Sequence, residues 1–147
     1  MILLQTYDRL KIVEDRFRAA KASVDHFFAI CQKDSSQIDR IGLRVRDIRD
    51  CGNDLEDTYL IRAYAVFETI LRDYWHICKR RSRPNAEYLI NHVGSTRAAS
   101  SDDLKAVHAV REYRNRLVHG GAMPAKITMA EGRSYMCRFL RYLPPTW

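Results

Sequence analysis

Three residues near position 115 have side chains that could act together on a phosphodiester. Arg114 and Asn115 are adjacent, and His119 follows after three further residues. A histidine exchanges protons near neutral pH, and an arginine binds the anionic oxygens of a phosphate. Two glycines, Gly120 and Gly121, come directly after the histidine. The residue types therefore favour proton transfer beside a bound phosphate, provided that one element brings them together.

The sequence predicts that these residues lie near the end of one helix. Ser100 or Ser101 is a candidate N-cap, because Asp102 and Asp103 follow it and acidic residues are favoured in the first turn of a helix. Gly120 can adopt the left-handed conformation that commonly ends a helix. We therefore expect a helix between these two signals.

Most polar residues of this helix lie on one face, but Arg114 lies outside that face. At about 100° per residue, the polar face consists of His108, Glu112, Asn115 and His119. Arg114 falls within the apolar arc, where it must reach solvent along its stem or find a carboxylate or phosphate. On an ideal helix Arg114 and His119 point about 140° apart. A groove shared with a second copy of the chain would bring them together most easily.

The segment Arg114-Asn115-x-x-x-His119 resembles the signature of HEPN domains, in which an arginine precedes a histidine near the end of the penultimate helix. The upstream helix around Glu68 is similar to the family's helix with a glutamate near its middle. The first fifty residues or so match only in being helical. In one subgroup a tyrosine stands two residues after the histidine and is modified by a nucleotidyltransferase. Gly121 occupies that position here, which argues against this mode of regulation.

The resemblance implies a small helical homodimer, in many members a metal-independent endoribonuclease of toxin–antitoxin or antiphage systems. Other members are non-catalytic modules that bind RNA or a partner protein. The implied catalytic residues are Arg114, Asn115 and His119, with no cofactor and no metal ion. His119 would move protons, Arg114 would brace the phosphorane and Asn115 would orient the phosphate or the imidazole. The expected products are a 2′,3′-cyclic phosphate and a 5′-hydroxyl.

Four further residues are candidates for a supporting role. Glu68 lies among aromatic residues of a long helix and is a candidate partner for Arg114. A pair between Glu68 and Arg72, one turn away, is the simpler alternative. Arg111 and Arg116 lie on the helix of the motif itself and add positive charge to it.

The overall charge favours an anionic partner. The chain has 147 residues, a net charge of +7 and an isoelectric point of about 9.4, and arginine outnumbers lysine about threefold. The guanidinium group suits phosphate recognition, so RNA is the expected partner. A merely basic protein, or one that recruits an acidic protein such as an antitoxin, is the alternative. The length predicts a single domain over residues 1–147.

The cysteines and the hydropathy predict a cytoplasmic, soluble protein. Four scattered cysteines form no C-x-x-C pair and have no histidine at ligand spacing, which indicates free thiols without a zinc site. These are Cys31, Cys51, Cys78 and Cys137. No stretch approaches the roughly 20 apolar residues that span a bilayer, and the N-terminal apolar run is too short for a signal peptide.

The hydrophobic pattern predicts an all-α fold, an up-and-down bundle of two long antiparallel helices plus shorter ones. Apolar residues recur at steps of three and four over residues 3–31. Asn53 and Glu56 match a capping box, which predicts a second long helix from Asn53 to Arg81. That helix is apolar on nearly all sides and should lie centrally. Residues 37–52 fit a helix or a strand, and a short helix is favoured because their surroundings are helical.

Shorter helices are expected in the second half of the chain. Residues 84–93 predict one helix, stopped by Gly94, and Thr128 with Glu131 forms a capping box for the last one. The basic run at residues 79–83 fits either a solvated helix end or an RNA contact. The last helix should direct three apolar residues inward, namely Met136, Leu140 and Leu143.

Overall fold

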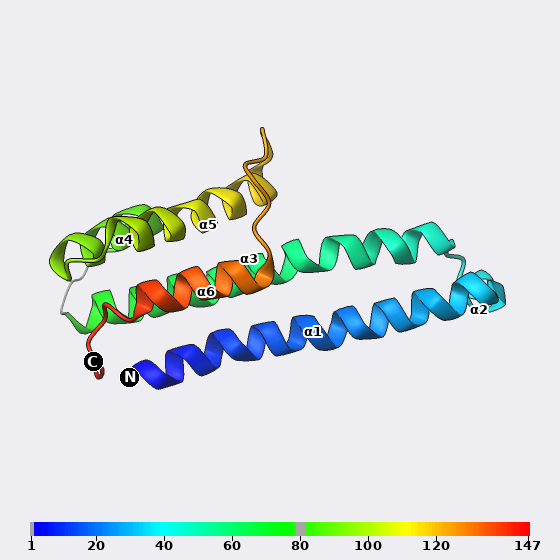
Figure 1. Ribbon diagram of the computed structural model, residues 1–147, viewed down its shortest axis with the longest axis horizontal. Helices are drawn as coiled ribbons and strands as arrows, with labels where there is room; N and C mark the ends of the chain where they lie inside the picture. The colour runs from blue at the N-terminus through cyan, green and yellow to red at the C-terminus, as the bar shows by residue number, and fades with distance from the viewer. Residues whose placement is uncertain (1, 79–81) are drawn as a thin grey trace.

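The expected all-α fold is confirmed by a computed structural model, in which residues 2–78 and 82–147 are described. The described residues form six helices and no β-strand. The two longest helices pack side by side, three of the shorter helices cover one end of this pair, and the shortest helix lies at the other end (Figure 1). The helices are α1 (Leu3–Lys33), α2 (Ser36–Asp39), α3 (Val45–Ile77), α4 (Ala86–Thr96), α5 (Ser101–His119) and α6 (Met129–Leu140).

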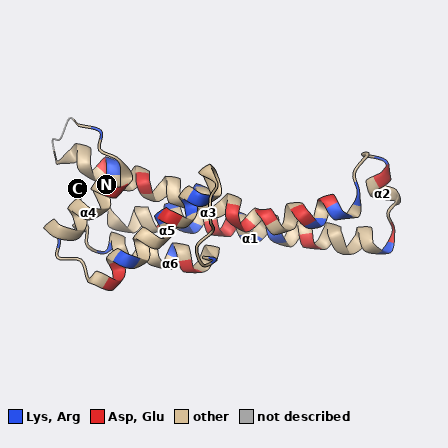
Figure 2. Cartoon of the chain, turned by 90° about the horizontal axis from the view of Figure 1, so that it is seen from above, with Lys and Arg blue, Asp and Glu red and all other residues tan. Residues whose placement is uncertain are grey.

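The paired helices α1 and α3 project beyond the rest of the molecule as an arm, which we define as residues 21–53 (Figures 1 and 2). Helix α6 begins beside the base of this arm, where the N–H of Met129 donates to Oε1 of Glu56, 3.0 Å away. Within the arm only Cys31, Ile38 and Gly52 are buried among the described residues. The arm therefore contributes little to the hydrophobic core.

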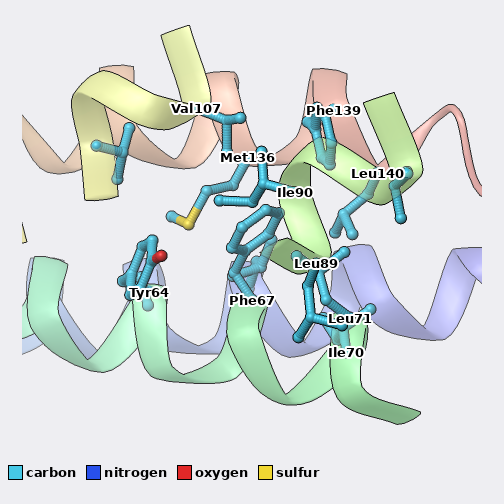
Figure 3. Close-up of a cluster of buried hydrophobic side chains, with 14 of the residues drawn as sticks. Tyr64, Phe67, Ile70, Leu71, Leu89, Ile90, Val107, Met136, Phe139 and Leu140 are labelled. Atoms are coloured by element: carbon cyan, nitrogen blue, oxygen red, sulfur yellow. The ribbon is translucent and has the colours of Figure 1, made fainter. Parts of the chain in front are cut away.

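The core lies at the other end of α3, which packs against α1, α4, α5 and α6. Phe67 of α3 is fully buried and contacts the ring of Phe139 from α6, with centroids 6.1 Å apart. Ile90 of α4 and Val107 of α5 belong to the same buried cluster (Figure 3). Burying each such side chain stabilises the fold by about 1.5–3 kcal/mol. The central position of α3 agrees with its apolar character on nearly all sides.

The predicted start of α3 at Asn53 is wrong. The helix begins at Val45, and Oδ2 of Asp47 accepts a hydrogen bond from the N–H of Arg44, 2.9 Å away. This earlier carboxylate caps the helix, and continuous packing against α1 carries the helix through Asn53. The ambiguous residues 37–52 therefore comprise most of α2, a turn at Gly42 with φ of +69°, and the first turns of α3.

The predicted end of α4 at Gly94 is also wrong, since the helix continues to Thr96. Gly94 is buried, and a Cβ at this position would lie 3.0 Å from Cδ1 of Leu104. Glycine there allows close packing of α4 on α5 instead of ending the helix. Helix α3 ends at Ile77, whereas residues 79–81 of the predicted basic run lie outside the described residues.

The predicted boundaries of α5 and of the start of α6 are confirmed. Oγ of Ser100 accepts from the N–H of Asp103, 3.1 Å away, and Gly120 ends α5 with φ of +79°. Thr128 and Glu131 form the expected capping box, in which Oε2 of Glu131 accepts from the N–H of Thr128 at 2.9 Å. The three inward residues of the last segment are all buried, namely Met136, Leu140 and Leu143.

The cysteines are free thiols, as the sequence predicts. Cys31 is buried in the arm, whereas Cys51 and Cys78 are exposed. Among the described helices, none combines the length and the apolar character that a bilayer crossing requires.

Gly132 allows the close contact between α6 and α3. A Cβ at this position would lie 2.4 Å from Cδ1 of Leu60, which is fully buried and has little room to turn away. We expect Gly132→Ala to lower the free energy of unfolding by about 1–3 kcal/mol through overpacking, despite the roughly 1 kcal/mol helix preference of alanine. Urea unfolding measures this change.

Ser134→Ala, at an exposed position of the same helix, is the control and should leave the midpoint nearly unchanged. Combining Gly132→Ala with Leu60→Ala should cost less than the sum of the two single changes, because the smaller side chain makes room for the methyl group. A midpoint for Gly132→Ala equal to that of the wild type would contradict this account of the contact.

Candidate functional site

His119 is the last residue of α5, and its side chain is exposed. It lines a hollow of about 440 Å³ together with Arg111, Glu112, Asn115 and Arg116. We call this hollow the His119 groove. No hydrogen bond or ion pair joins the imidazole to another described residue, so both ring nitrogens are available to contact a bound group.

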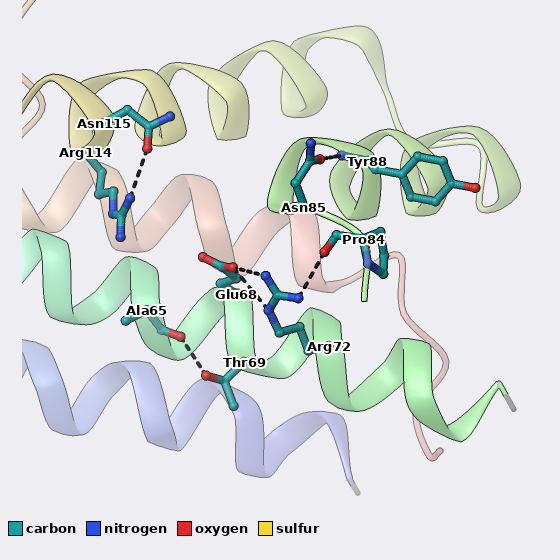
Figure 4. A network of polar contacts seen from close by, with 9 residues as sticks. All are labelled: Ala65, Glu68, Thr69, Arg72, Pro84, Asn85, Tyr88, Arg114 and Asn115. Carbon is teal, nitrogen blue, oxygen red and sulfur yellow. Dashed lines mark hydrogen bonds and ion pairs between the residues drawn. The ribbon is translucent and has the colours of Figure 1, made fainter. Parts of the chain in front are cut away.

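Arg114 lines a different hollow, of about 240 Å³, between α3, α4 and α5. We call it the Tyr64 pocket, after the buried tyrosine of α3 that lines it. Glu68 and Arg72 also line this pocket from α3, and Asn85 lines it from the start of α4 (Figure 4). The two hollows share a wall formed by Arg111 and Asn115.

Although Arg114 lies in the apolar arc of α5, its guanidinium contacts the face of an aromatic ring. The guanidinium Cζ lies 5.7 Å from the centroid of the Tyr64 ring, within the range of a cation–π contact. Nη1 of Arg114 donates to Oδ1 of Asn115, 3.1 Å away. Tyr64 is not among the partners expected from the sequence. In the sequence, its only indication is a position one helical turn before Glu68.

Glu68 pairs with Arg72, which confirms the simpler of the two alternatives. Nη2 and Nε of Arg72 donate to Oε1 of Glu68 over 2.5 Å and 3.2 Å, and Nη1 donates to the carbonyl of Pro84 over 3.0 Å. The alternative pair with Arg114 does not form among the described residues. Arg72 has the advantage because it lies one turn away on the same helix and does not have to cross the pocket.

The remaining supporting residues also have carboxylate partners. Nη2 of Arg111 lies 3.2 Å from Oε2 of Glu87 on α4. Nη2 of Arg116 lies 3.9 Å from Oε1 of Glu112 in a more exposed, weaker pair. Arg111 is thus held at the wall between the two hollows, whereas Arg116 borders only the His119 groove.

The structure therefore divides the predicted residues between two neighbouring hollows. Arg114 belongs to the Tyr64 pocket and His119 to the groove, with Asn115 and Arg111 in both. Within one chain, Arg114 and His119 do not line the same hollow. This arrangement follows from their positions on different flanks of α5, about 140° apart on an ideal helix.

Two further groups near the site have altered pKa values. Burial raises the pKa of the Tyr64 hydroxyl above its usual value, so the group keeps its proton and can donate. Burial lowers the pKa of His108, and the nearby Arg111 lowers it further, whereas Glu87 raises it. Nε2 of His108 lies 2.8 Å from Oδ1 of Asn91 on α4. His108 therefore joins two helices and does not line either hollow.

Comparison with known proteins finds no matching family model, no similar curated protein and no similar solved structure. The part of the chain that the structure describes holds no group of three or more His, Cys, Asp or Glu side chains placed to bind a metal ion.

His108 should make stability depend on pH. Its pKa in the folded state lies below its ordinary value of 6.5, so the unfolded chain binds the proton more readily. Its contribution to stability is therefore lost as the pH falls below the ordinary value. Replacing His108 by Gln keeps a donor for Asn91 and should flatten the fall in the free energy of unfolding between about pH 7 and pH 5.

Urea unfolding at a series of pH values measures this effect. His26→Gln, at an exposed position of the arm, is the matched control. Slopes that are equal for His108→Gln and the wild type would show that His108 does not contribute to the pH dependence.

Proposed function

We propose that this chain is a HEPN-type endoribonuclease that cleaves RNA without a metal ion. Support comes from Arg114, Asn115 and His119 at the end of α5, where the imidazole is exposed in a groove bordered by arginines. The net charge of +7 favours a polyanionic substrate. The resemblance to HEPN domains further suggests a role as a toxin or as a component of antiphage defence.

The proposed reaction uses the ribose 2′-hydroxyl as the nucleophile. The 2′-oxygen forms a bond to phosphorus while the bond from phosphorus to the 5′-oxygen breaks, which leaves a 2′,3′-cyclic phosphate and a 5′-hydroxyl. His119 either accepts the proton of the 2′-hydroxyl or donates one to the leaving 5′-oxygen, and water completes the other proton transfer. Arg114 stabilises the charge of the phosphorane, and Asn115 orients the phosphate. DNA lacks the nucleophile and is not a substrate.

A homodimer would complete this site. Arg114 and His119 of one chain line separate hollows on two flanks of α5, with Arg111 and Asn115 between them. If two copies place these flanks opposite each other, Arg114 of one copy comes to face His119 of the other. An isologous contact of this kind would form two equivalent sites from one surface.

A non-catalytic dimeric module that binds RNA or a partner protein, such as an acidic antitoxin, is the alternative function. One observation favours it. The guanidinium of Arg114 is already engaged with the Tyr64 ring and with Asn115. In that function Arg114 would hold an interface, and no RNA would be cut.

Cleavage should depend on both Arg114 and His119. We expect purified protein to cleave mixed RNA in EDTA, and His119→Ala and Arg114→Ala to lower the rate by about 10²- to 10⁴-fold each, because each loses a proton-transfer or charge-stabilising group. Product ends are analysed for the 2′,3′-cyclic phosphate. DNA of the same sequence should remain intact.

The matched controls are His26→Ala and Arg16→Ala, which change exposed residues of α1 and should cleave at the wild-type rate. Cleavage that survives both site substitutions in folded protein would remove these residues from the mechanism. A folded wild-type dimer that binds RNA but never cuts it would instead support the non-catalytic module.

A further inference from the structure

Three buried polar atoms, each on a residue that lines the Tyr64 pocket, have no hydrogen-bond partner among the described residues. They are the hydroxyl of Tyr64 and the Nε atoms of Arg111 and Arg114. All three can donate a hydrogen bond, since the arginines have no acceptor and the tyrosine keeps its proton. A buried donor without an acceptor is costly. The pocket is therefore prepared for a group that supplies acceptor oxygens.

The charges of the pocket leave one guanidinium unbalanced. Glu68 is engaged by Arg72, and Glu87 by Arg111. Arg114 has no carboxylate within ion-pair distance in the described part of the chain. Two of the three arginines are thus neutralised by the two glutamates of the pocket, and a single positive charge remains. A ligand with one negative charge balances it.

Asn115 adds a further donor. Its Oδ1 accepts from Arg114, over 3.1 Å, so the amide nitrogen is the group left to bind a ligand. The pocket volume of about 240 Å³ exceeds that of a few water molecules, at roughly 30 Å³ each. It is smaller than the roughly 300–1,000 Å³ of sites that enclose a whole small molecule. A phosphate group fits, whereas an attached nucleoside must extend outside.

We infer that the Tyr64 pocket binds one phosphodiester group of the substrate strand, with Tyr64 and Arg114 donating hydrogen bonds to its two non-bridging oxygens. A phosphodiester has one negative charge and acceptor oxygens only, which matches both the unbalanced guanidinium and the donors without partners. The inference deepens the proposed function and rests on it, because the bound phosphate is the one that Arg114 would stabilise during cleavage. Tyr64 becomes an additional binding residue of that site.

Tyr64→Phe tests this directly, because it removes one hydroxyl and leaves the ring that Arg114 contacts. Tyr113→Phe is the matched control. Tyr113 is also buried, but its hydroxyl donates to Oδ1 of Asp57, 2.9 Å away, outside both hollows. The probe is a dinucleotide with a single phosphodiester and a 2′-O-methyl group, which cannot be cleaved. Calorimetric titration measures binding, and urea unfolding measures stability.

We expect Tyr64→Phe to bind the dinucleotide about 5- to 20-fold more weakly, since it loses a charge-assisted hydrogen bond. Its stability should equal or exceed that of the wild type, because the lost hydroxyl had no partner. Tyr113→Phe should show the opposite pattern, with unchanged binding and lower stability. A purely structural tyrosine would not lose affinity while keeping stability.

Two analogues identify what is recognised. A methylphosphonate dinucleotide, which lacks the negative charge, should not bind. A 2′-deoxy dinucleotide should bind like the 2′-O-methyl probe, because the contacts are to the phosphate and not to the sugar. Equal binding of the methylphosphonate would overturn the inference, as would a pocket that binds an acidic peptide but neither charged dinucleotide.

The outcomes separate this inference from the proposed function. Weaker dinucleotide binding by Tyr64→Phe, with no RNA cleavage by the wild type, would support the phosphate pocket and reject the nuclease. Cleavage by the wild type, with binding and cleavage unchanged in Tyr64→Phe, would reject the role of Tyr64 and keep the nuclease.

Discussion

The contact between the guanidinium of Arg114 and the ring of Tyr64 joins α5 to α3, beside the buried core residues Val107, Val110 and Tyr113 of α5. A charged group in the apolar arc of a helix has few favourable positions, and the face of a buried ring is one of them. Arg114 and these buried residues together fix the rotation of α5 about its own axis. The hollow that each polar residue lines therefore follows from the rotation of α5.

The same orientation separates the functional groups. Because α5 directs Arg114 toward α3, it must expose His119 on another flank, and Gly120 with its positive φ ends the helix directly afterwards. Arg111 and Asn115 lie between the two flanks and border both hollows. In a single chain, Arg114 and His119 therefore lie in two neighbouring hollows and not in one. This is the physical reason for connecting the proposed chemistry with a second copy.

The parts of this arrangement that depend on local rules were predictable from the sequence. The N-cap of α5 at Ser100 and the pair between Glu68 and Arg72 both involve residues within four positions of each other. The start of α3 was not predictable, because Asn53 has the residue type of a cap but lies within a helix that packs continuously on α1. The role of Tyr64 was not predictable from the sequence either. It depends on a contact between two helices that no spacing within either helix encodes.

The identity of residue 64 is not explained by packing alone. The side chain is almost completely buried, and its hydroxyl has no partner among the described residues. Phenylalanine would fill nearly the same space without the cost of burying an unpaired hydroxyl. A buried polar group without a partner is expected where a protein binds its ligand. Tyr64 lines the same pocket as Arg114 and Asn115, the two residues that the sequence predicts to bind a phosphate. A module that used this surface only to hold a second chain would have no need for the unpaired hydroxyl of Tyr64.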